Sequence, residues 1–389
     1  MRILILSFYY PPDLSAGSFR TQGLVKALEE KMSPNGEIEV VTSLPNRYHS
    51  LSTDADEVEE NGAVRIKRIP VPSHRSGLID QSVAFGVFAL KAFSYARRGN
   101  YDLVYATSSR LFTAFLGAVI ARRSNIPLYL DIRDIFVDTI QEVLPRSLGL
   151  GLLPTLRAIE RYTIKAAARV NLVSEGFRQY FRSGYPNQTF SFFPNGIDEE
   201  FLGVDFTKAE TNKTPIVLYA GNIGKGQGLD KIVPELASKS MEHEFWIVGD
   251  GGAKQPLEKG LRKKGAENVR LSTPINRSRL IQLYADADYL FLHLNDYQAF
   301  RRVLPSKIFE YAATGKPILA GVDGYAADFL RENVDNVAVF PPCDASAAVD
   351  AIQTLSERHT PRPKFISRFE RKLVMRGLAA DLLMLQLRN

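Results

Sequence analysis

Residues 216–230, IVLYAGNIGKGQGLD, indicate the fold of the chain more directly than any other stretch. The apolar run IVLYA is typical of a strand that is buried on both faces. Four glycines follow at 221, 224, 226 and 228, and a helical pattern begins after them. A buried strand that turns through glycines into a helix is the repeating unit of a parallel sheet covered by helices.

The same alternation of strands and helices extends in both directions from this segment. Before it, strands are expected at 2–8, 37–43, 64–69, 102–107, 128–134, 169–174 and 190–194, with helices such as 18–31, 111–123 and 155–168 between them. After it, strands are expected at 244–249, 269–273, 289–294, 317–321 and 337–340. This order of elements predicts parallel sheets, whose ligands bind at the carboxyl ends of the strands.

The polar stretch 209–215, AETNKTP, separates the two series of strands and is typical of a linker. At 389 residues the chain is also long for a single hydrophobic core. We therefore predict an α/β protein with two doubly wound, Rossmann-like domains that face a central cleft, the first at 1–200 and the second at 201–365. Residues 366–389 form a helical pattern with no strand after it, and we expect this helix to pack back on the first domain.

Composition limits the class of protein. The net charge of +6 and the pI near 9.2 suit phosphorylated ligands or an anionic membrane surface, and they fit an ordinary basic enzyme equally well. The single cysteine, Cys343, excludes an internal disulfide and fits a reducing compartment. No stretch reaches about 18 consecutive apolar residues, and the N-terminal apolar run is too short for a signal peptide. We expect a cytoplasmic protein, soluble or peripheral on the inner face of the membrane.

The glycine loop at 221–228 is a candidate phosphate site. Backbone N–H groups in such a loop come close to a diphosphate, and Lys225 and Gln227 add side-chain donors. A second glycine turn, VGDGG at 248–252, ends the next strand. Two purely structural tight turns would give the same pattern, but both turns fall at strand carboxyl ends of one sheet, which favours a ligand.

The stretch 304–321, LPSKIFEYAATGKPILAG, places a Lys and a Glu three residues apart near the start of a helix. Pro305 and Ser306 indicate the helix start, and residues three apart share one helix face. Lys307 suits a phosphate group, and Glu310 suits the two hydroxyls of a ribose. A surface ion pair explains the spacing equally well, but it does not explain the position beside two glycine turns.

Two stretches of the first domain carry polar residues at strand ends. In YYPPDLSAGSFR (9–20), Gly17 stands where a helix begins, with Ser18 as a possible cap, and backbone N–H groups there attract an anion. In YLDIRDIFVDT (129–139), Arg133 and Asp134 follow a strand, and the Asp is a candidate general base, with helix capping as the alternative. The turn FFPNGID (192–198) predicts a hinge.

Nucleophilic triads and metal sites are not supported by the pattern. The five histidines lie in no recognisable Ser or Cys motif, and no cluster of His and Asp has the spacing of metal ligands. His293, at a strand end, is better explained as a core histidine bonded to the backbone. We expect no metal and no nucleic-acid partner.

The segment 76–98, SGLIDQSVAFGVFALKAFSYARR, is a long helical pattern that is apolar on one side and basic at its end. Such a helix lies either at a membrane surface or in the interior of a domain. The stretch RSLGLGLLP (146–154) adds leucines in what we predict to be a glycine-rich loop, which favours a membrane-facing surface.

Taken together, AGSFR, RDIFVDT, FFPNGID, YAGNIGKGQGLD, VGDGG and LPSKIFEYAATGKPILA resemble glycosyltransferase family 4, of the two-domain GT-B fold. The likeness covers essentially the whole chain. Within this family, the chain resembles the bacterial branch of N-acetylfucosaminyl and related amino-sugar transferases of O-antigen and capsule assembly. It implies metal-independent, anomer-retaining transfer from a UDP-sugar. It also implies donor-binding roles for Gly17, Gly221, Asn222, Lys225, Gln227, Gly249, Pro305, Ser306, Lys307 and Glu310, and catalytic roles for Asp134, Arg133 and Lys307.

The chain departs from the family pattern at three places. The first Glu of the paired-glutamate motif, eight residues before the second, is Arg302 here. Asn222 and Gln227 stand where many members have Arg and Lys in the donor loop. Arg133 stands where many members have a His before the Asp. The residues that we expect to replace the missing phosphate clamp are Lys225, Arg301, Arg302 or Lys307.

These observations predict a glycosyltransferase of bacterial surface polysaccharide synthesis. The donor would be a UDP-linked N-acetylated amino or deoxyamino sugar, held by the second domain. The acceptor would be a glycan held by the first domain, with a polyprenyl-diphosphate-linked glycan as one candidate. A UDP-sugar epimerase of the same fold and a catalytically silent partner subunit are the alternatives.

Overall fold

The computed structural model describes the chain except for residues 14, 33, 46–54, 73–77, 109–110, 136, 139–145, 208–213, 357 and 387–389. The chain divides into two compact units. The N-terminal unit comprises Met1–Gly196 and Arg371–Asn389, and the C-terminal unit comprises Ile197–Glu370. The divisions therefore lie at 196/197 and 370/371, where the sequence suggested 200/201 and 365/366.

The N-terminal unit is built on an eight-stranded sheet with the order β3-β4-β2-β1-β5-β6-β7-β8. Every neighbouring pair is parallel except β3 with β4. The central strand, RILIL, is almost wholly apolar because both of its faces are covered. The strands are β1 (Arg2–Leu6), β2 (Glu37–Ser43), β3 (Val58–Asn61), β4 (Val64–Ile69), β5 (Leu103–Thr107), β6 (Leu128–Ile132), β7 (Arg169–Leu172) and β8 (Phe190–Ser191).

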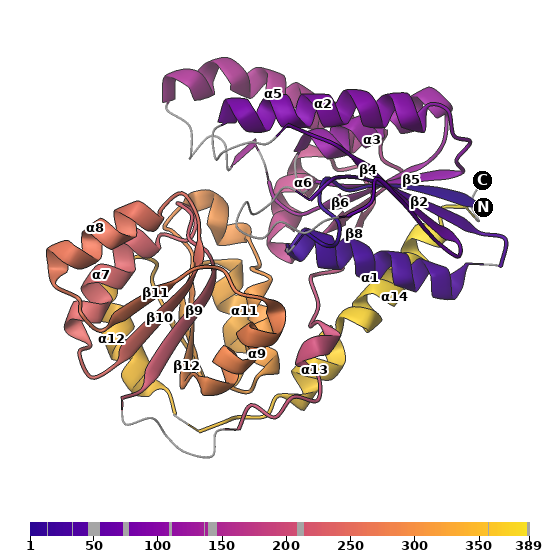
Figure 1. The fold of residues 1–389 in the computed structure, drawn as a ribbon. Helices are drawn as coiled ribbons and strands as arrows, with labels where there is room; N and C mark the ends of the chain where they lie inside the picture. Colours follow the sequence, from indigo (N-terminus) through magenta and orange to yellow (C-terminus); the bar gives the residue numbers. More distant parts are fainter. Residues whose placement is uncertain are drawn as a thin grey trace. The chain divides into compact units, whose positions relative to one another are not determined.

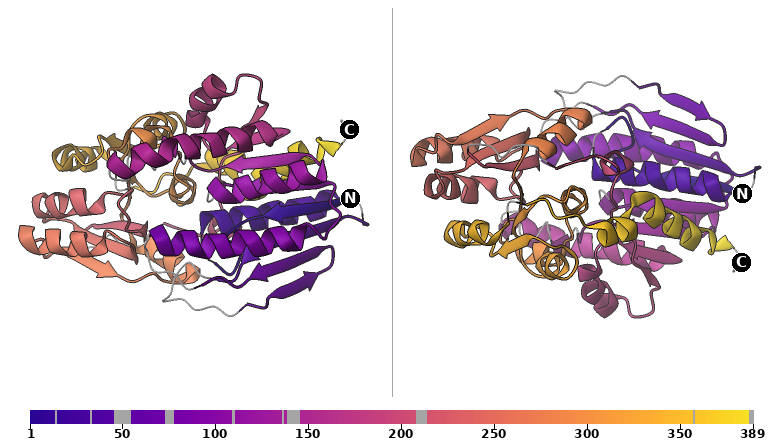
Figure 2. Two further views of the ribbon diagram at one scale, coloured as in Figure 1. Left: turned by 90° about the horizontal axis from the view of Figure 1, so that it is seen from above. Right: turned by 90° about the horizontal axis from the view of Figure 1, so that it is seen from below.

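Helices cover both faces of this sheet, as Figures 1 and 2 show. One face carries α1 (Ala16–Lys31) and α14 (Arg371–Leu383), whose apolar side chains share one core with β1, β2 and β5. The other face carries α2 (Leu78–Ala96), α3 (Leu111–Ser124) and α5 (Arg146–Ala166), with α3 between the other two. The short helices η1 (Glu175–Phe177) and α6 (Arg178–Gly184) follow β7.

The C-terminal unit contains a six-stranded, fully parallel sheet with the order β11-β10-β9-β12-β13-β14. One face packs on α7, α8 and α12, and the other packs on α9, α10, α11 and α13. The strands are β9 (Ile216–Asn222), β10 (Glu244–Asp250), β11 (Val269–Ser272), β12 (Tyr289–His293), β13 (Ile318–Gly321) and β14 (Val337–Phe340). The helices are η2 (Glu199–Phe201), α7 (Leu229–Lys239), α8 (Lys254–Lys264), α9 (Arg277–Asp286), η3 (Gln298–Arg302), α10 (Lys307–Ala313), α11 (Tyr325–Asn333), α12 (Ala345–Thr354) and α13 (Pro363–Phe369).

Two sequence-based expectations of local structure are wrong. The expected glycine-rich loop at 146–154 is the first part of α5, because the side chains of Leu153 and Leu156 are buried against the unit and packing outweighs the low helix propensity of glycine. The expected single C-terminal helix is two helices. The backbone of Glu370 leaves the helical conformation (φ −53°, ψ 126°), so α13 ends in the C-terminal unit and α14 begins in the N-terminal unit.

A buried ion pair joins four segments of the N-terminal unit. The guanidinium of Arg20 on α1 donates to both carboxylate oxygens of Asp131 on β6, at 2.8 and 2.9 Å, and both side chains are 0% exposed. Arg20 also donates to the carbonyl oxygens of Phe193 and Pro194, at 2.9 and 2.6 Å. Asn171 on β7 donates to Asp131 at 2.7 Å. The cluster therefore holds α1, β6, β7 and the 193–194 turn together.

The pKa values of the pair show that both groups stay charged. Burial alone would lower the pKa of Arg20 and raise that of Asp131, but each partner reverses the effect on the other. The pKa of Arg20 therefore lies above its ordinary value, and the pKa of Asp131 lies below it.

Replacing Arg20 by Met should destabilise the N-terminal unit by about 3 to 5 kcal/mol, because a buried carboxylate loses its counterion. Urea unfolding followed by circular dichroism measures the change. Fluorescence of Trp246, the single tryptophan, reports on β10 of the C-terminal unit and should change little.

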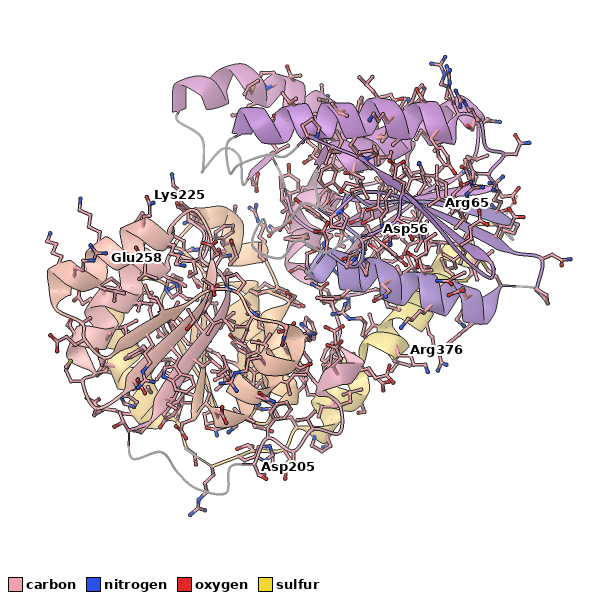
Figure 3. The ribbon with its side chains drawn as sticks, viewed as in Figure 1. Asp56, Arg65, Asp205, Lys225, Glu258 and Arg376 are labelled. Atoms are coloured by element: carbon pink, nitrogen blue, oxygen red, sulfur yellow. The ribbon has the colours of Figure 1, made fainter. Side chains whose placement is uncertain are left out.

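The control is Arg376→Met. Arg376 on α14 (Figure 3) forms an exposed pair with Glu30 on α1. An equal loss in both variants would contradict the assignment, because surface pairs contribute little.

Candidate functional site

All of the predicted donor residues except Gly17 lie in the C-terminal unit, where Gly221 and Gly249 stand at the carboxyl ends of β9 and β10. Gly221 and Gly249 are paired in register on these two strands. A Cβ atom on Gly249 would collide with the carbonyl oxygen of Gly221, and one on Gly221 would come within 2.7 Å of Cε of Lys307. Only glycine permits this approach, which brings the two strand ends and the first residue of α10 together.

The glycine loop after β9 is braced by its own side chains. Asn222 donates from Nδ2 to Oε1 of Gln227 at 2.9 Å, and the backbone N–H of Gly224 donates to the same oxygen at 3.2 Å. Lys225 is exposed and points away from the ribbon in Figure 3. Gln227 and Lys225 were predicted as side-chain donors. Gln227 instead accepts two bonds through Oε1 and braces the loop, whereas the Lys225 ammonium group is accessible.

His293, the last residue of β12, binds the backbone of the same loop. Its Nδ1 donates to the carbonyl oxygen of Gln227 at 2.6 Å, and its Nε2 accepts from the backbone N–H of Cys343 at 2.9 Å. The histidine is therefore neutral and bonded to backbone on both sides, which confirms its interpretation as a core residue. Burial lowers its pKa to about 4, and the proximity of Lys231 acts in the same direction.

Asn295, just beyond β12, adds two further bonds to the loop. Its side chain donates to the carbonyl oxygen of Lys225 at 2.8 Å, and its backbone N–H donates to the carbonyl oxygen of Gly226 at 2.8 Å. Neither His293 nor Asn295 was expected as a site residue. Their bonds reach back along the chain by more than sixty residues, so no local pattern marks them.

The Lys and Glu of α10 form the i,i+3 ion pair that the spacing suggests, but the pair is partly buried and does not lie at the surface. Their side chains are only 22% and 12% exposed, and Nζ of Lys307 lies 3.6 Å from Oε2 of Glu310. Burial lowers the pKa of Lys307, against the opposing effect of Glu310. Pro305 and Ser306 precede the helix, and their carbonyl oxygens accept its first backbone N–H groups at 3.2 Å.

Two residues outside the predicted set contact Glu310. Arg277, the first residue of α9, donates from Nη1 to Oε1 at 3.2 Å. Tyr284, on the same helix, donates to Oε2 at 3.1 Å. They lie 33 and 26 residues before Glu310, a separation that no helical or strand period reveals. Glu310 is thus part of a partly buried polar cluster and not an isolated helix-surface carboxylate.

The predicted residues of the N-terminal unit form a second group. The carboxyl end of β6 leads into Arg133, whose backbone N–H donates to Oγ of Ser108 at 2.9 Å. A Cβ on Gly17 would lie 3.7 Å from the Arg133 guanidinium, so the start of α1 adjoins this residue. The cap of α1 is Ser15, which accepts from the N–H of Ser18 at 3.1 Å, and the expectation of Ser18 as the cap is wrong.

Asp134 follows Arg133 and keeps contact with solvent. The protein around its carboxyl group nevertheless raises its pKa to about 6 by desolvation, against the opposing charge of Arg133. A carboxylate with this pKa is able to take up and release a proton near neutral pH.

In the part of the chain that the structure describes, no group of three or more His, Cys, Asp or Glu side chains is placed to hold a metal ion. Within the same residues, no helix has the length and apolar character required to span a membrane.

Two family models match the chain, one in each half. The Glycosyl transferase 4-like domain matches residues 18–196, and the model for Glycosyl transferases group 1 matches residues 204–372. The chain belongs to these glycosyltransferases. The glycine loop, α10 and Glu310 all lie in the region matched by the group 1 model. Asp134 lies in the region matched by the 4-like model, and Gly17 lies one residue before that region begins.

The glycosyltransferase is similar to proteins from several bacteria. It is 26% identical to the putative colanic acid biosynthesis glycosyl transferase WcaI of Escherichia coli, over 90% of each chain. It is 22% identical to the 2-deoxystreptamine N-acetyl-D-glucosaminyltransferase of Niallia circulans, over 79% of its own length and 82% of the relative's.

Solved structures with the same fold include HepE of Anabaena in complex with UDP and glucose. Its TM-score is 0.70 at 17% identity, with 99% of both chains covered. WaaG, a glycosyltransferase involved in lipopolysaccharide biosynthesis, has a TM-score of 0.65 at 16% identity, with 100% of this chain and 98% of that one covered. These likenesses confirm the expected GT-B fold with two parallel-sheet domains.

His293 should make the stability of the C-terminal unit depend on pH. Its folded pKa of about 4 lies below the ordinary value of 6.5, so its contribution is complete above about pH 6.5 and is lost as the pH falls toward about 4. We expect a loss of about 2 kcal/mol between about pH 7.5 and about pH 5. Urea unfolding followed by Trp246 fluorescence measures it. In His293→Gln this part of the pH dependence should disappear, and an unchanged dependence would contradict the assignment.

Proposed function

We propose that this glycosyltransferase moves a sugar from a UDP-sugar to a glycan acceptor in bacterial surface polysaccharide synthesis, with retention of anomeric configuration. The observation that carries the proposal is the position of Glu310. This carboxylate is held by three neighbours beside the close-packed strand ends of Gly221 and Gly249, where a parallel sheet binds its ligands.

The chemistry of this edge suits a nucleoside diphosphate. An ionised carboxylate only accepts hydrogen bonds, and Glu310 accepts from Arg277 and Tyr284. A carboxylate is also the acceptor type that suits the two hydroxyls of a ribose. Lys307 and the exposed Lys225, with the amides of the glycine loop, supply positive charge for a diphosphate.

The named relatives support the donor and the pathway class. HepE was solved with UDP and with UDP-glucose, which supports UDP as the nucleotide. WcaI is named for colanic acid biosynthesis, which supports a polysaccharide product. The N-acetyl-D-glucosaminyltransferase from Niallia circulans supports an N-acetylated amino or deoxyamino sugar as the transferred group.

On the acceptor side we assign the chemistry to the second group of residues. Asp134, with its pKa near 6, receives the proton of the attacking hydroxyl, and Arg133 lies beside it. Catalysis then depends on positioning and on stabilising the departing diphosphate by Lys307 and the loop amides. In this proposal the cationic side chains take the charge and no metal is needed.

Nucleotide binding tests the donor assignment. Calorimetric titration with UDP, GDP, ADP and dTDP in the presence of EDTA should show that UDP binds most tightly. Lys307→Met should weaken UDP binding by about 10- to 100-fold, because a charged partner of the diphosphate is lost. The matched control is Lys239→Met, since this exposed lysine on α7 pairs with Glu235.

The outcomes separate the proposal from its alternatives. Equal effects of both lysine variants would contradict the role of Lys307. If no nucleotide binds, the silent partner subunit becomes the better interpretation. If UDP-sugar is isomerised or hydrolysed at the same rate with and without a glycan acceptor, the epimerase becomes the better interpretation.

We also propose that the N-terminal unit lies on an anionic membrane and takes a polyprenyl-diphosphate-linked acceptor at its cytoplasmic face. Val83 and Leu90 lie two turns apart on α2 and are 54% and 73% exposed. Lys91 on this helix, and Arg97 and Arg98 directly after its end, are exposed as well. An exposed apolar face next to basic residues is the pattern of a helix at a membrane surface.

The membrane proposal predicts that Val83→Glu with Leu90→Glu lowers binding to vesicles that contain phosphatidylglycerol. Removing two apolar anchors and adding two negative charges should reduce the bound fraction at least about tenfold. Co-sedimentation measures this fraction. Leu373→Glu on α14, also an exposed leucine of the N-terminal unit, is the control and should bind as the native chain does. Equal binding of all three proteins would contradict the membrane role of α2.

A further inference from the structure

Arg277 uses all three nitrogens of its guanidinium on carboxylates. Nη1 donates to Glu310 at 3.2 Å, Nε donates to Glu200 at 2.6 Å, and Nη2 donates to Asp198. The guanidinium carbon also lies 4.6 Å from the ring centre of Phe201. The Arg277 side chain is 19% exposed, and Asp198 and Glu310 are each 12% exposed, so these two bonds are largely shielded from water. Glu200 is 55% exposed, so its bond to Arg277 lies at the surface.

The three acids come from two distant parts of the chain. Asp198 and Glu200 belong to the entry segment, residues 197–201, with which the C-terminal unit begins. Glu310 belongs to α10 at the donor edge. A single guanidinium thus joins the entry segment to the carboxylate that we assign to the ribose.

The same cluster is stiffened by aromatic packing. The ring of Tyr284, which donates to Glu310, is stacked on Phe201 with centroids 5.7 Å apart and planes 18° apart. Phe201 therefore contacts both residues that donate to Glu310. Arg277 and Tyr284 each bind a different oxygen of the carboxylate, so together they fix the rotation of its plane as well as its position.

We propose that Arg277 is a positioning residue that orients the Glu310 carboxylate for the ribose hydroxyls of the donor, and that Asp198 and Glu200 hold the guanidinium for this task. The inference rests on the proposed function, since it takes Glu310 as the ribose acceptor. Arg277 does not touch the ribose itself and acts through Glu310.

The chemistry of arginine explains why this residue type is required. Its planar fork presents five N–H donors on three nitrogens and serves three carboxylates from one fixed geometry. A lysine in its place keeps the positive charge but has one nitrogen on a flexible stem, so it loses the orientation. The charge itself is secure: burial would lower the pKa of Arg277, but Glu310, Asp198 and Glu200 raise it above the ordinary value.

The test compares the affinities of UDP and 2′-deoxy-UDP on the same protein. The native chain should bind UDP at least about tenfold more tightly, because the 2′-hydroxyl donates to a charged acceptor. In Arg277→Lys this ratio should fall to about threefold or less, and in Glu310→Gln it should approach one. A ratio of two affinities on one variant does not depend on how much of that variant is folded, so loss of stability alone leaves it unchanged.

Two further variants sharpen the comparison. Arg279→Lys changes an exposed arginine on the same helix, bonded to Gln282, and should keep the native ratio. Asp198→Asn removes the charge of one acid that holds the guanidinium without touching Glu310, and should lower the ratio in the same direction as Arg277→Lys.

Each result has a distinct meaning. If the native chain discriminates the two nucleotides and Glu310→Gln abolishes this, but Arg277→Lys keeps the native ratio, the inference is overturned while the proposed function stands. If the native chain binds both nucleotides equally, the ribose assignment of Glu310 fails and the inference fails with it. If no UDP binds at all, the proposed function fails first.

Discussion

The buried ion pair between Arg20 and Asp131 is the constraint on which the N-terminal unit depends. Neither group has water as an alternative partner, so the helix, the two strands and the turn that they join must stay in one arrangement. Gly17 lies one helical turn before Arg20, and Arg133 lies two residues after Asp131. The pair therefore helps to position Gly17 and Arg133, and the bond from the Arg133 backbone N–H to Ser108 adds to its effect.

The C-terminal unit reaches a similar rigidity by other means. Its glycine loop is fixed by backbone close approach at Gly221 and Gly249, and by bonds from His293 and Asn295 to loop carbonyl oxygens. These bonds are short and neutral, whereas the Glu310 carboxylate is held by a charged partner, Arg277. The unit thus combines an uncharged support for the glycine loop with a charged support for Glu310.

The sequence predicts the sheets well because buried parallel strands leave long apolar runs, and β2, β4 and β14 have the expected bounds. It predicts α5 poorly, since its glycines and Pro154 suggest a loop and only burial of the leucines overrides them. The edge strand β3, VEEN, is too polar to be recognised. The glycine loop and α10 are visible as motifs. Arg277 and Tyr284 are not, because polar partners far apart in sequence leave no period.

The chain crosses between the units twice, and the second crossing has a consequence for synthesis on the ribosome. The apolar face of α1 is covered by α14, through side chains such as Met375 and Leu378 that pack with Leu24 and Leu28. These residues are translated some 350 positions after their partners. The C-terminal unit is one continuous segment and is complete before α14 is made. The nascent chain must therefore keep the exposed leucines of its first helix from aggregating until α14 has been synthesised.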